Sequence, residues 1–207
     1  MSVVAAIKED NVVYIGCDSQ VTKGGTRTTL NNKNNYKIWK VENADHCLMG
    51  HVGYVRDANI VRLMDDLVRD YDVFNDSIDY RYVVKRVTPY IISELKEYGF
   101  IKDDKTFDSM DSSFLFAYKD RLFVIGSDAS VIEVDDCVAI GSGSEQAIGS
   151  LLSTTNEKPE SRIIKAIKAS AASDIYVDYP IILSNTKDTE FKVINKGDEK
   201  HKKGDDK

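Results

Sequence analysis

The sequence predicts an α+β protein in which two antiparallel β-sheets pack between two layers of helices. Three observations favour this architecture. The predicted elements come in groups, in the order strands, two helices, strands, two helices, strands. Neighbouring strands are joined by connections too short for the crossovers of a parallel sheet. The first two strands are apolar on both faces, as in a sheet that is covered on both sides.

Short apolar runs bounded by turn residues predict the strands. Before the first helices these are Val3–Lys8, Val12–Asp18, Tyr36–Val41 and His46–Val52. The later ones are Ser112–Tyr118, Arg121–Ser127, Ser130–Val134, Val138–Ile140, Ile175–Leu183 and Glu190–Ile194. The polar segment 19–35, which contains Gly24-Gly25, predicts a loop.

Apolar residues recur at helical spacing in four segments. The predicted helices are Val55–Tyr71, Asp79–Tyr98, Ser144–Ser153 and Pro159–Ala172. Pro89 is expected to kink or break the second helix, and Gly99 to cap its C-terminus. Because no linker or internal repeat divides the chain, we expect one domain over residues 1–194 and a charged, disordered tail over 195–207.

The composition is ordinary for a globular protein, with 42% hydrophobic and 30% charged residues in a chain of 207. The net charge of −6 argues against a nucleic-acid binder, and no apolar run reaches the roughly 20 residues that span a bilayer. A signal peptide is not apparent, so we expect a cytoplasmic protein. Cys17, Cys47 and Cys137 stand in apolar runs, which is typical of buried thiols rather than of disulfides or a metal site.

Ser2 stands directly before the first predicted strand, and Met1 precedes it. Removal of Met1, which a small second residue permits, would place a serine at the chain terminus. That residue would carry a nucleophile and, in an α-amine with a pKa of roughly 7.7–8.0, a base as well. The amine could take the hydroxyl proton, directly or through water, during attack on a carbonyl. The alternative is that Ser2 is simply a permissive second residue.

Four short motifs follow Ser2. They are Gly16-Cys17-Asp18-Ser19, Tyr36-Lys37-Ile38, Cys47-Leu48-Met49-Gly50-His51-Val52-Gly53 and Ala139-Ile140-Gly141-Ser142-Gly143-Ser144. In order and spacing, the chain from Ser2 to about Ile194 resembles the proteasome β-subunit family of N-terminal-nucleophile hydrolases, and above all its bacterial HslV-like (ClpQ) branch. The resemblance implies a four-layer αββα sandwich. It also implies an endopeptidase of the threonine/serine type, with Ser2 where the family usually has threonine.

The resemblance assigns a charged pair to the nucleophile. Lys37 would favour the neutral amine and the developing alkoxide, and Asp18 would keep Lys37 charged and oriented. Lys33 is a rival to Lys37, although the strand start at Tyr36-Lys37-Ile38 matches the family better. The structural alternatives are a solvated lysine at a strand edge and an aspartate in a turn.

The resemblance implies three further roles around the nucleophile. Gly50 would donate its backbone N–H to the oxyanion, unless it is a glycine required for packing. Leu48, two residues earlier, would line the pocket for the substrate side chain that precedes the cleaved bond. Ser142 would hydrogen-bond the terminal amine. His51 alternates away from this face of its strand, so we expect it to be structural.

A cation site is also implied by the resemblance. In the HslV-like branch, the turn after the last helix offers backbone carbonyls to a sodium-like cation, which implicates Ser173, Tyr176 and Tyr179. A plain loop is the alternative. The proteasome branch has an aspartate before a Ser-Gly pair in this region, whereas this chain has Lys168 and Ser170. We expect no required cofactor beyond such a structural sodium ion.

The resemblance implies a self-compartmentalising peptidase: stacked rings of this chain, polypeptide substrates and a partner unfoldase that uses ATP. Residues 141–144 lack the lysine and spacing of a P-loop, so any use of ATP would belong to the partner. Two alternatives share the fold: a non-catalytic ring subunit that keeps Met1, and an N-terminal-nucleophile amidohydrolase acting on a small amide. A binding module without chemistry is the third.

Overall fold

The computed structural model describes residues 2–98 and 110–198. One sheet has five antiparallel strands in the order β10-β1-β2-β11-β12. They are β1 (Val4–Glu9), β2 (Val12–Cys17), β10 (Cys137–Ile140), β11 (Ile181–Asn185) and β12 (Lys192–Ile194). The other sheet has the order β5-β6-β7-β8-β9 and is also antiparallel. Its strands are β5 (Ile38–Lys40), β6 (Cys47–Val52), β7 (Ser113–Tyr118), β8 (Arg121–Ile125) and β9 (Val131–Val134).

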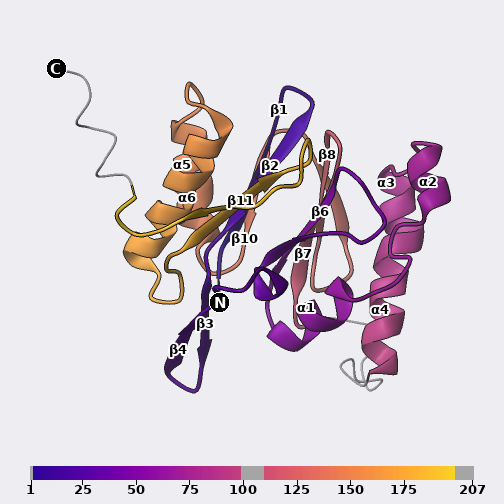
Figure 1. Cartoon of the computed structure of the whole chain (residues 1–207), viewed down its shortest axis with the longest axis horizontal. Coiled ribbons are helices and arrows are strands. Elements are labelled where there is room, and N and C mark those ends of the chain that lie inside the picture. The colour runs from indigo at the N-terminus through magenta and orange to yellow at the C-terminus, as the bar shows by residue number, and fades with distance from the viewer. Residues whose placement is uncertain (1, 99–109, 199–207) are drawn as a thin grey trace.

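Helices form the outer layers, and the four layers are seen side by side in Figure 1. The first sheet is covered by α5 (Ser144–Ser153) and α6 (Pro159–Ser173), which pack on β1 and β2. The second is covered by α1 (Val55–Arg62), α2 (Asp70–Phe74), α3 (Tyr80–Tyr82) and α4 (Thr88–Glu97), with a π-helical turn at Val83–Val87. This arrangement confirms the predicted αββα sandwich. No helix within the described residues could span a membrane.

Three apolar cores separate the four layers. Because side chains alternate along a strand, Val4 faces the second sheet and packs with Leu115, whereas Ile7 faces the helices and packs with Ile167. The third core lies between the second sheet and α1–α4 and includes Met49. Sheets buried on both faces explain why the central strands are continuous apolar runs.

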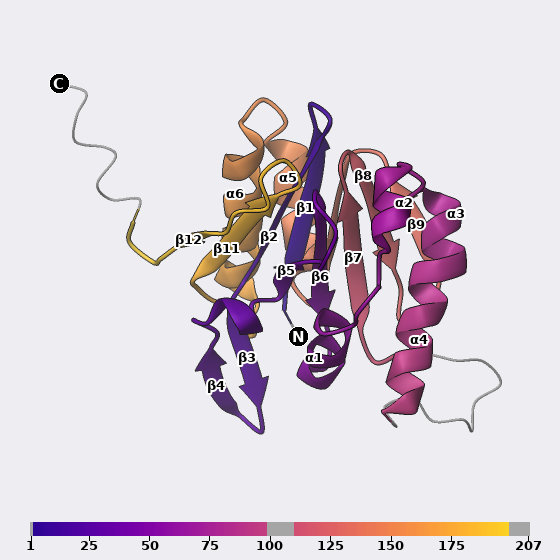
Figure 2. The ribbon, with the colours of Figure 1, turned by 45° about the vertical axis from the view of Figure 1, so that its right-hand side comes forward.

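The prediction that residues 19–35 form a loop is wrong in part. It contains a hairpin, β3 (Gln20–Lys23) and β4 (Thr26–Thr29), which projects from the body in Figures 1 and 2, and a 3₁₀ turn at Lys33–Asn35. Gly24 and Gly25 both have positive φ, the conformation that a two-residue hairpin turn requires. The strands carry no apolar alternation because most of the hairpin faces solvent.

Two predicted helices differ in their extent. The helix expected to reach Tyr71 ends at Arg62, and the chain resumes helical structure at Asp70. The segment between them still buries Leu67 and Val68, which produced the apolar spacing. The next helical stretch contains the predicted irregularity near Pro89. A π-helical turn ends at Val87, two residues before this proline, which lacks an N–H to donate. The predicted cap Gly99 lies outside the described residues.

The end of the chain also departs from the prediction. The strand expected from Ile175 begins at Ile181. Asp174 shapes the preceding loop, because its Oδ1 accepts from Tyr176 N–H at 2.9 Å and its carbonyl from Val177 N–H at 3.1 Å. Pro180 directly precedes β11 and has no N–H for the ladder. Of the predicted tail, the structure describes only residues 195–198.

Candidate active site

Ser2 is buried where β10 meets α5. Its backbone nitrogen donates to Ser142 Oγ at 3.1 Å, and its carbonyl accepts from Gly143 N–H at 3.3 Å. Gly141 has φ +102°, and a Cβ at this position would lie 2.2 Å from Ser2 O. The glycine-rich turn therefore lets the chain before β1 pass directly against residues 141–143. The structure brings together Ser2 and Ser142, as the sequence predicts.

Asp18 and Lys37 form a buried ion pair beside the same segment. Lys37 Nζ lies 2.7 Å from Asp18 Oδ1 and 2.5 Å from Gln20 O. Asp18 also accepts from Val3 N–H at 3.0 Å and from Gln20 N–H at 2.9 Å. The side chains are 6% and 0% exposed, and only such complete hydrogen bonding offsets the desolvation of a buried pair. The rival Lys33 is exposed in its 3₁₀ turn.

Gly50 does not occupy the predicted position for an oxyanion donor. It lies in the middle of β6, opposite Ile38 and Leu115. Because His51 N–H donates to Lys37 O on the β5 side, alternation directs the Gly50 N–H into the ladder with β7. A Cβ here would lie 2.8 Å from Val4 Cγ1, so packing between the sheets requires this glycine.

Leu48 does not line a substrate pocket as the sequence analysis expects. Its side chain is fully buried in the core between the two sheets, with Ile15 and Leu115 among its neighbours in that core. It therefore cannot contact a substrate. The two-residue spacing from Gly50 put both residues on the same face of β6, and that face is turned inwards.

Gly53, three residues after Gly50, was not predicted as a site residue. It is exposed at the end of β6, has φ +130°, and its N–H has no hydrogen-bond partner among residues 2–98 and 110–198. Its neighbour Val52 reaches Gly141, which touches Ser2. The signal was present in the sequence: a glycine at a strand end leaves the ladder, whereas one in mid-strand does not.

A buried polar network holds Gly53 in place. Ser112 Oγ donates to Asp57 Oδ2 at 2.6 Å, accepts from Tyr54 N–H at 3.1 Å and lies 3.1 Å from His51 Nε2. A Cβ on Gly53 would lie 2.4 Å from Ser112 Oγ, so the glycine packs directly on this hub. The network therefore fixes the backbone at the junction between β6 and α1.

Burial controls the titration of the side chains around the site. It lowers the pKa of His51 to about 3, assisted by the charges of Lys37 and Arg62, so this imidazole is neutral at physiological pH. Burial raises the pKa of Cys17 to about 12 and that of Cys47 further. These thiols are inert as nucleophiles. Cys17, Cys47 and Cys137 are all free. Cys17 and Cys47 are buried as predicted, whereas Cys137 is only partly buried.

The loop after α6 contains an unsatisfied carboxylate oxygen. Asp174 Oδ2 is buried and has no hydrogen-bond partner within the described part of the chain. Asp174 N–H donates to Ser170 O, and Ser170 Oγ donates to Gly143 O next to Ser142. Sequence reasoning considered Lys168 and Ser170 here and missed Asp174, whose burial depends on distant elements. The three predicted carbonyls belong to residues in and beside this loop.

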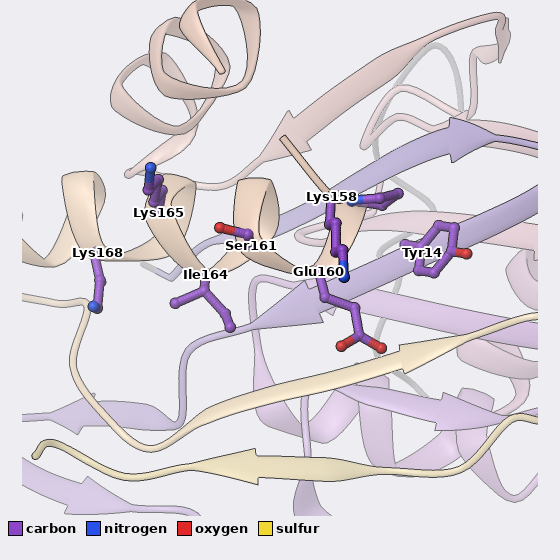
Figure 3. Close-up of a pocket in the computed structure, with 8 residues that line it drawn as sticks. Tyr14, Lys158, Glu160, Ser161, Ile164, Lys165 and Lys168 are labelled. Carbon is purple, nitrogen blue, oxygen red and sulfur yellow. The ribbon is translucent and has the colours of Figure 1, made fainter. Parts of the chain in front are cut away.

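Two surface hollows, one beside Tyr14 and one beside Thr186, lie apart from these residues. The one in Figure 3 has a volume of about 500 Å³ and lies between Tyr14 and α6, beside several lysines. Its lining includes Lys158, Lys165 and Lys168 but none of the residues around Ser2. We therefore place the candidate site by its buried network rather than by a cavity.

The αββα fold, with a candidate nucleophile directly before β1, defines a protein of the N-terminal-nucleophile hydrolase class. The model of the Proteasome subunit family matches residues 2–176, and the chain belongs to that family. Its membership confirms the predicted resemblance.

Solved structures of several proteasome-like proteins are similar in fold. BPH from Thiobacillus denitrificans, in complex with epoxomicin, superposes with a TM-score of 0.66 at 18% identity, covering 91% of this chain and 99% of that chain. Eukaryotic HslV from Trypanosoma brucei gives 0.63 at 17% identity, covering 88% and 98%. The Anbu (Gly-1) mutant from Hyphomicrobium sp. strain MC1 gives 0.68 at 14% identity, covering 98% and 91%.

Proposed function

We propose that this chain is a catalytic subunit of a proteasome-like peptidase, with Ser2 as its nucleophile once Met1 is removed. The observation that carries the proposal is the burial of the Lys37–Asp18 pair against the segment that holds Ser2. A buried ion pair seldom adds stability over apolar packing, so its presence beside a serine favours a chemical role.

Each residue of the candidate site has its own role in the proposed reaction. Ser2 Oγ attacks the peptide carbonyl while the Ser2 α-amine takes the hydroxyl proton and passes it to the leaving amine. The C–N bond breaks and an ester to Ser2 forms, which water then hydrolyses. Lys37 stabilises the developing alkoxide by its charge, and Asp18 orients Lys37. The Gly53 N–H is the donor we assign to the oxyanion.

Ser142 holds the backbone nitrogen of Ser2 in this scheme. We also propose a sodium ion in the loop after α6, bound by the carbonyls of Ser173, Tyr176 and Tyr179. The buried Asp174 Oδ2, which has no hydrogen-bond partner within the described residues, would then gain a cationic neighbour. Such an ion would stabilise the loop and take no part in the reaction.

The assembly follows from the family. We expect copies of this chain to form stacked rings that enclose the sites, fed with unfolded polypeptides by an ATP-dependent unfoldase in the cytoplasm. Sedimentation of the purified protein measures the ring size. A monomer or small oligomer that hydrolyses small amides would instead support the amidohydrolase alternative.

The decisive measurement is the intact mass of the protein from its native host, before and after treatment with epoxomicin. We expect loss of Met1 and one adduct per chain, mapped to Ser2 by peptide sequencing. The Ser2→Ala variant should form no adduct and hydrolyse no peptide, whereas Ser153→Ala, at an exposed serine of α5, should behave as the wild type. Retained Met1 without an adduct would identify a non-catalytic ring subunit.

A further inference from the structure

Gln20, the first residue of β3, contacts both members of the buried ion pair through its backbone. Its N–H donates to Asp18 Oδ2 at 2.9 Å, and its carbonyl accepts from Lys37 Nζ at 2.5 Å. Asp18 also holds the N–H of Val3, the residue next to Ser2. A shift of this corner between β2 and β3 would therefore displace both charges beside the candidate nucleophile.

The side chain of Gln20 joins this corner to the loop after α6. It is 2% exposed, and its Nε2 donates to Ile175 O at 2.8 Å and to Thr22 Oγ1 at 2.9 Å. The Ile175 side chain is 76% exposed, so its carbonyl rather than apolar packing holds the loop at this residue. Ser19 N–H also donates to Asp178 O at 3.1 Å. The corner and the loop thus form one hydrogen-bonded unit.

The same loop leads to the other group that contacts Ser2. Asp174 N–H donates to Ser170 O at 2.8 Å, and Ser170 Oγ donates to Gly143 O at 2.6 Å. Ser142, which precedes Gly143, accepts from the backbone nitrogen of Ser2 at 3.1 Å. The ion pair and Ser142 therefore belong to one continuous network around Ser2, and the loop after α6 connects them.

An amide is an unfavourable choice for folding alone at position 20. Gln20 Oε1 is buried and has no hydrogen-bond partner within residues 2–98 and 110–198. A buried acceptor without a partner lowers stability, and an apolar side chain of the same length would avoid this loss. The amide of Gln20 is therefore better explained by what its two N–H donors hold in place.

We propose that Gln20 is a positioning residue: its side-chain amide holds the corner that orients Lys37 and Asp18. The inference rests on the proposed peptidase function and adds a residue that acts through the ion pair. Displacement of a catalytic group by about 1 Å can lower the rate by about 10²-fold, so loss of the amide should slow the chemical step. Binding should stay unchanged, because the Gln20 side chain is buried.

The test measures how fast epoxomicin labels Ser2, as the rate at saturation and the concentration that gives half of this rate. Gln20→Met keeps about the length of the side chain and removes its donors. We expect the rate at saturation to fall by about 10–100-fold and the half-saturating concentration to stay within about threefold. Hydrolysis of a fluorogenic peptide should show the same split between kcat and KM. Gln20→Ala removes the same donors without straining the core and should behave alike.

Asn185→Leu is the matched control. Asn185 is also a buried amide, at the end of β11 that lies away from Ser2. Its Nδ2 donates to Asp188 Oδ1 at 3.1 Å, and its Oδ1 accepts from Lys187 N–H at 2.8 Å. The replacement should lower the urea midpoint and leave both labelling constants unchanged.

Arg27→Gln is a second control within the same two segments. Arg27 of β4 is paired with Asp178 of the loop at 3.1 Å, but its side chain is 61% exposed. Because an exposed pair contributes little, we expect labelling of this variant to match the wild type.

The outcomes separate the two proposals. Gln20 variants that label at the wild-type rate, or in which only the half-saturating concentration rises, overturn the positioning role and leave the peptidase intact. An equal fall in either control also overturns it, because the effect would then not be specific to the Gln20 amide. Absence of both labelling and hydrolysis in the wild type overturns the peptidase, and the role of Gln20 with it.

Discussion

The two ends of the β-sandwich are tied together in different ways. At one end Lys37 of the second sheet is paired with Asp18 of the first, and both side chains are buried. At the other end Thr186 Oγ1, after β11, accepts from Val13 N–H at 3.0 Å and donates to Lys119 O at 2.5 Å in the β7–β8 turn. This neutral hydroxyl and the contact of 2.8 Å between His46 Nδ1 and Thr186 O join the sheets there.

The charged side chains at the second end are exposed to solvent. Lys119 pairs with Asp76 at 2.9 Å, with side chains 41% and 60% exposed. Exposed pairs contribute about 0–1 kcal/mol, whereas a buried pair carries a desolvation cost of several kcal/mol per ion. Since a neutral group is enough to connect the sheets, the buried charges at the first end are better explained by chemistry than by folding.

The largest expected effect comes from breaking the buried pair. Lys37→Met leaves the Asp18 carboxylate buried without its counterion, so the free energy of unfolding should fall by about 3–5 kcal/mol. Peptide hydrolysis should fall by a factor of at least about 10²–10⁴, because Lys37 no longer supports proton transfer at Ser2. Urea unfolding and single-turnover assays measure the two effects.

The matched control is Lys119→Met, which should change the free energy of unfolding by less than about 1 kcal/mol and leave activity intact. The double variant Asp18→Asn/Lys37→Met sharpens the comparison, because it removes both buried charges. It should regain most of the stability but none of the activity. Recovered hydrolysis in the double variant would contradict the catalytic role of the pair.

A smaller effect is expected from Ser112→Ala. The change leaves His51 and the Asp57 carboxylate without their shared partner and loosens the backbone around Gly53. We expect kcat to fall by about 10–100-fold with little change in KM, and stability to fall by about 1–3 kcal/mol. Ser130→Ala removes a hydrogen bond of the same length, 2.6 Å to Asp128 Oδ1, at an exposed turn and should change neither. A rise in KM alone would argue against a positioning role.

The sequence predicts the layers well, because apolar runs and helical spacing are local patterns that burial imposes. The prediction fails where a strand lacks apolar alternation or where buried residues at helical spacing are not helical. The β3–β4 hairpin was taken for a loop because strands that face solvent need no apolar alternation. The helix predicted to reach Tyr71 was too long because Leu67 and Val68 are buried without being helical.

The candidate site shows the same division. Ser2, Asp18, Lys37 and Ser142 are brought together as the motifs and the resemblance suggest. The predicted strand 46–52 already placed Gly50 in mid-strand and Gly53 beyond the strand end, but which N–H groups the ladder with β7 uses is seen only in the fold. The unpartnered Asp174 Oδ2 was beyond the sequence, because a missing partner is visible only once distant elements have packed.

His51 should make stability depend on pH. Its pKa in the folded protein is about 3 because of burial, against roughly 6.5 when unfolded, so the unfolded chain binds the proton first. The free energy of unfolding should therefore fall as pH falls below about 6.5, by about 2 kcal/mol between pH 7 and pH 5. His51→Gln, which can still bond Ser112, should remove this slope in urea titrations, and His46→Gln should retain it. An unchanged slope in His51→Gln would show that another group is responsible.

The smallest effect should come from Thr186→Val, at the end of the sandwich away from Ser2. The variant removes the hydroxyl that Val13 N–H and Lys119 O share, and the shape of the side chain is nearly preserved. We expect the free energy of unfolding to fall by about 1 kcal/mol and kcat/KM to be unchanged. A loss of activity here as large as that of Ser112→Ala would mean that the two ends are coupled through the strands. The buried charges at Ser2 could then no longer be assigned to chemistry by their position alone.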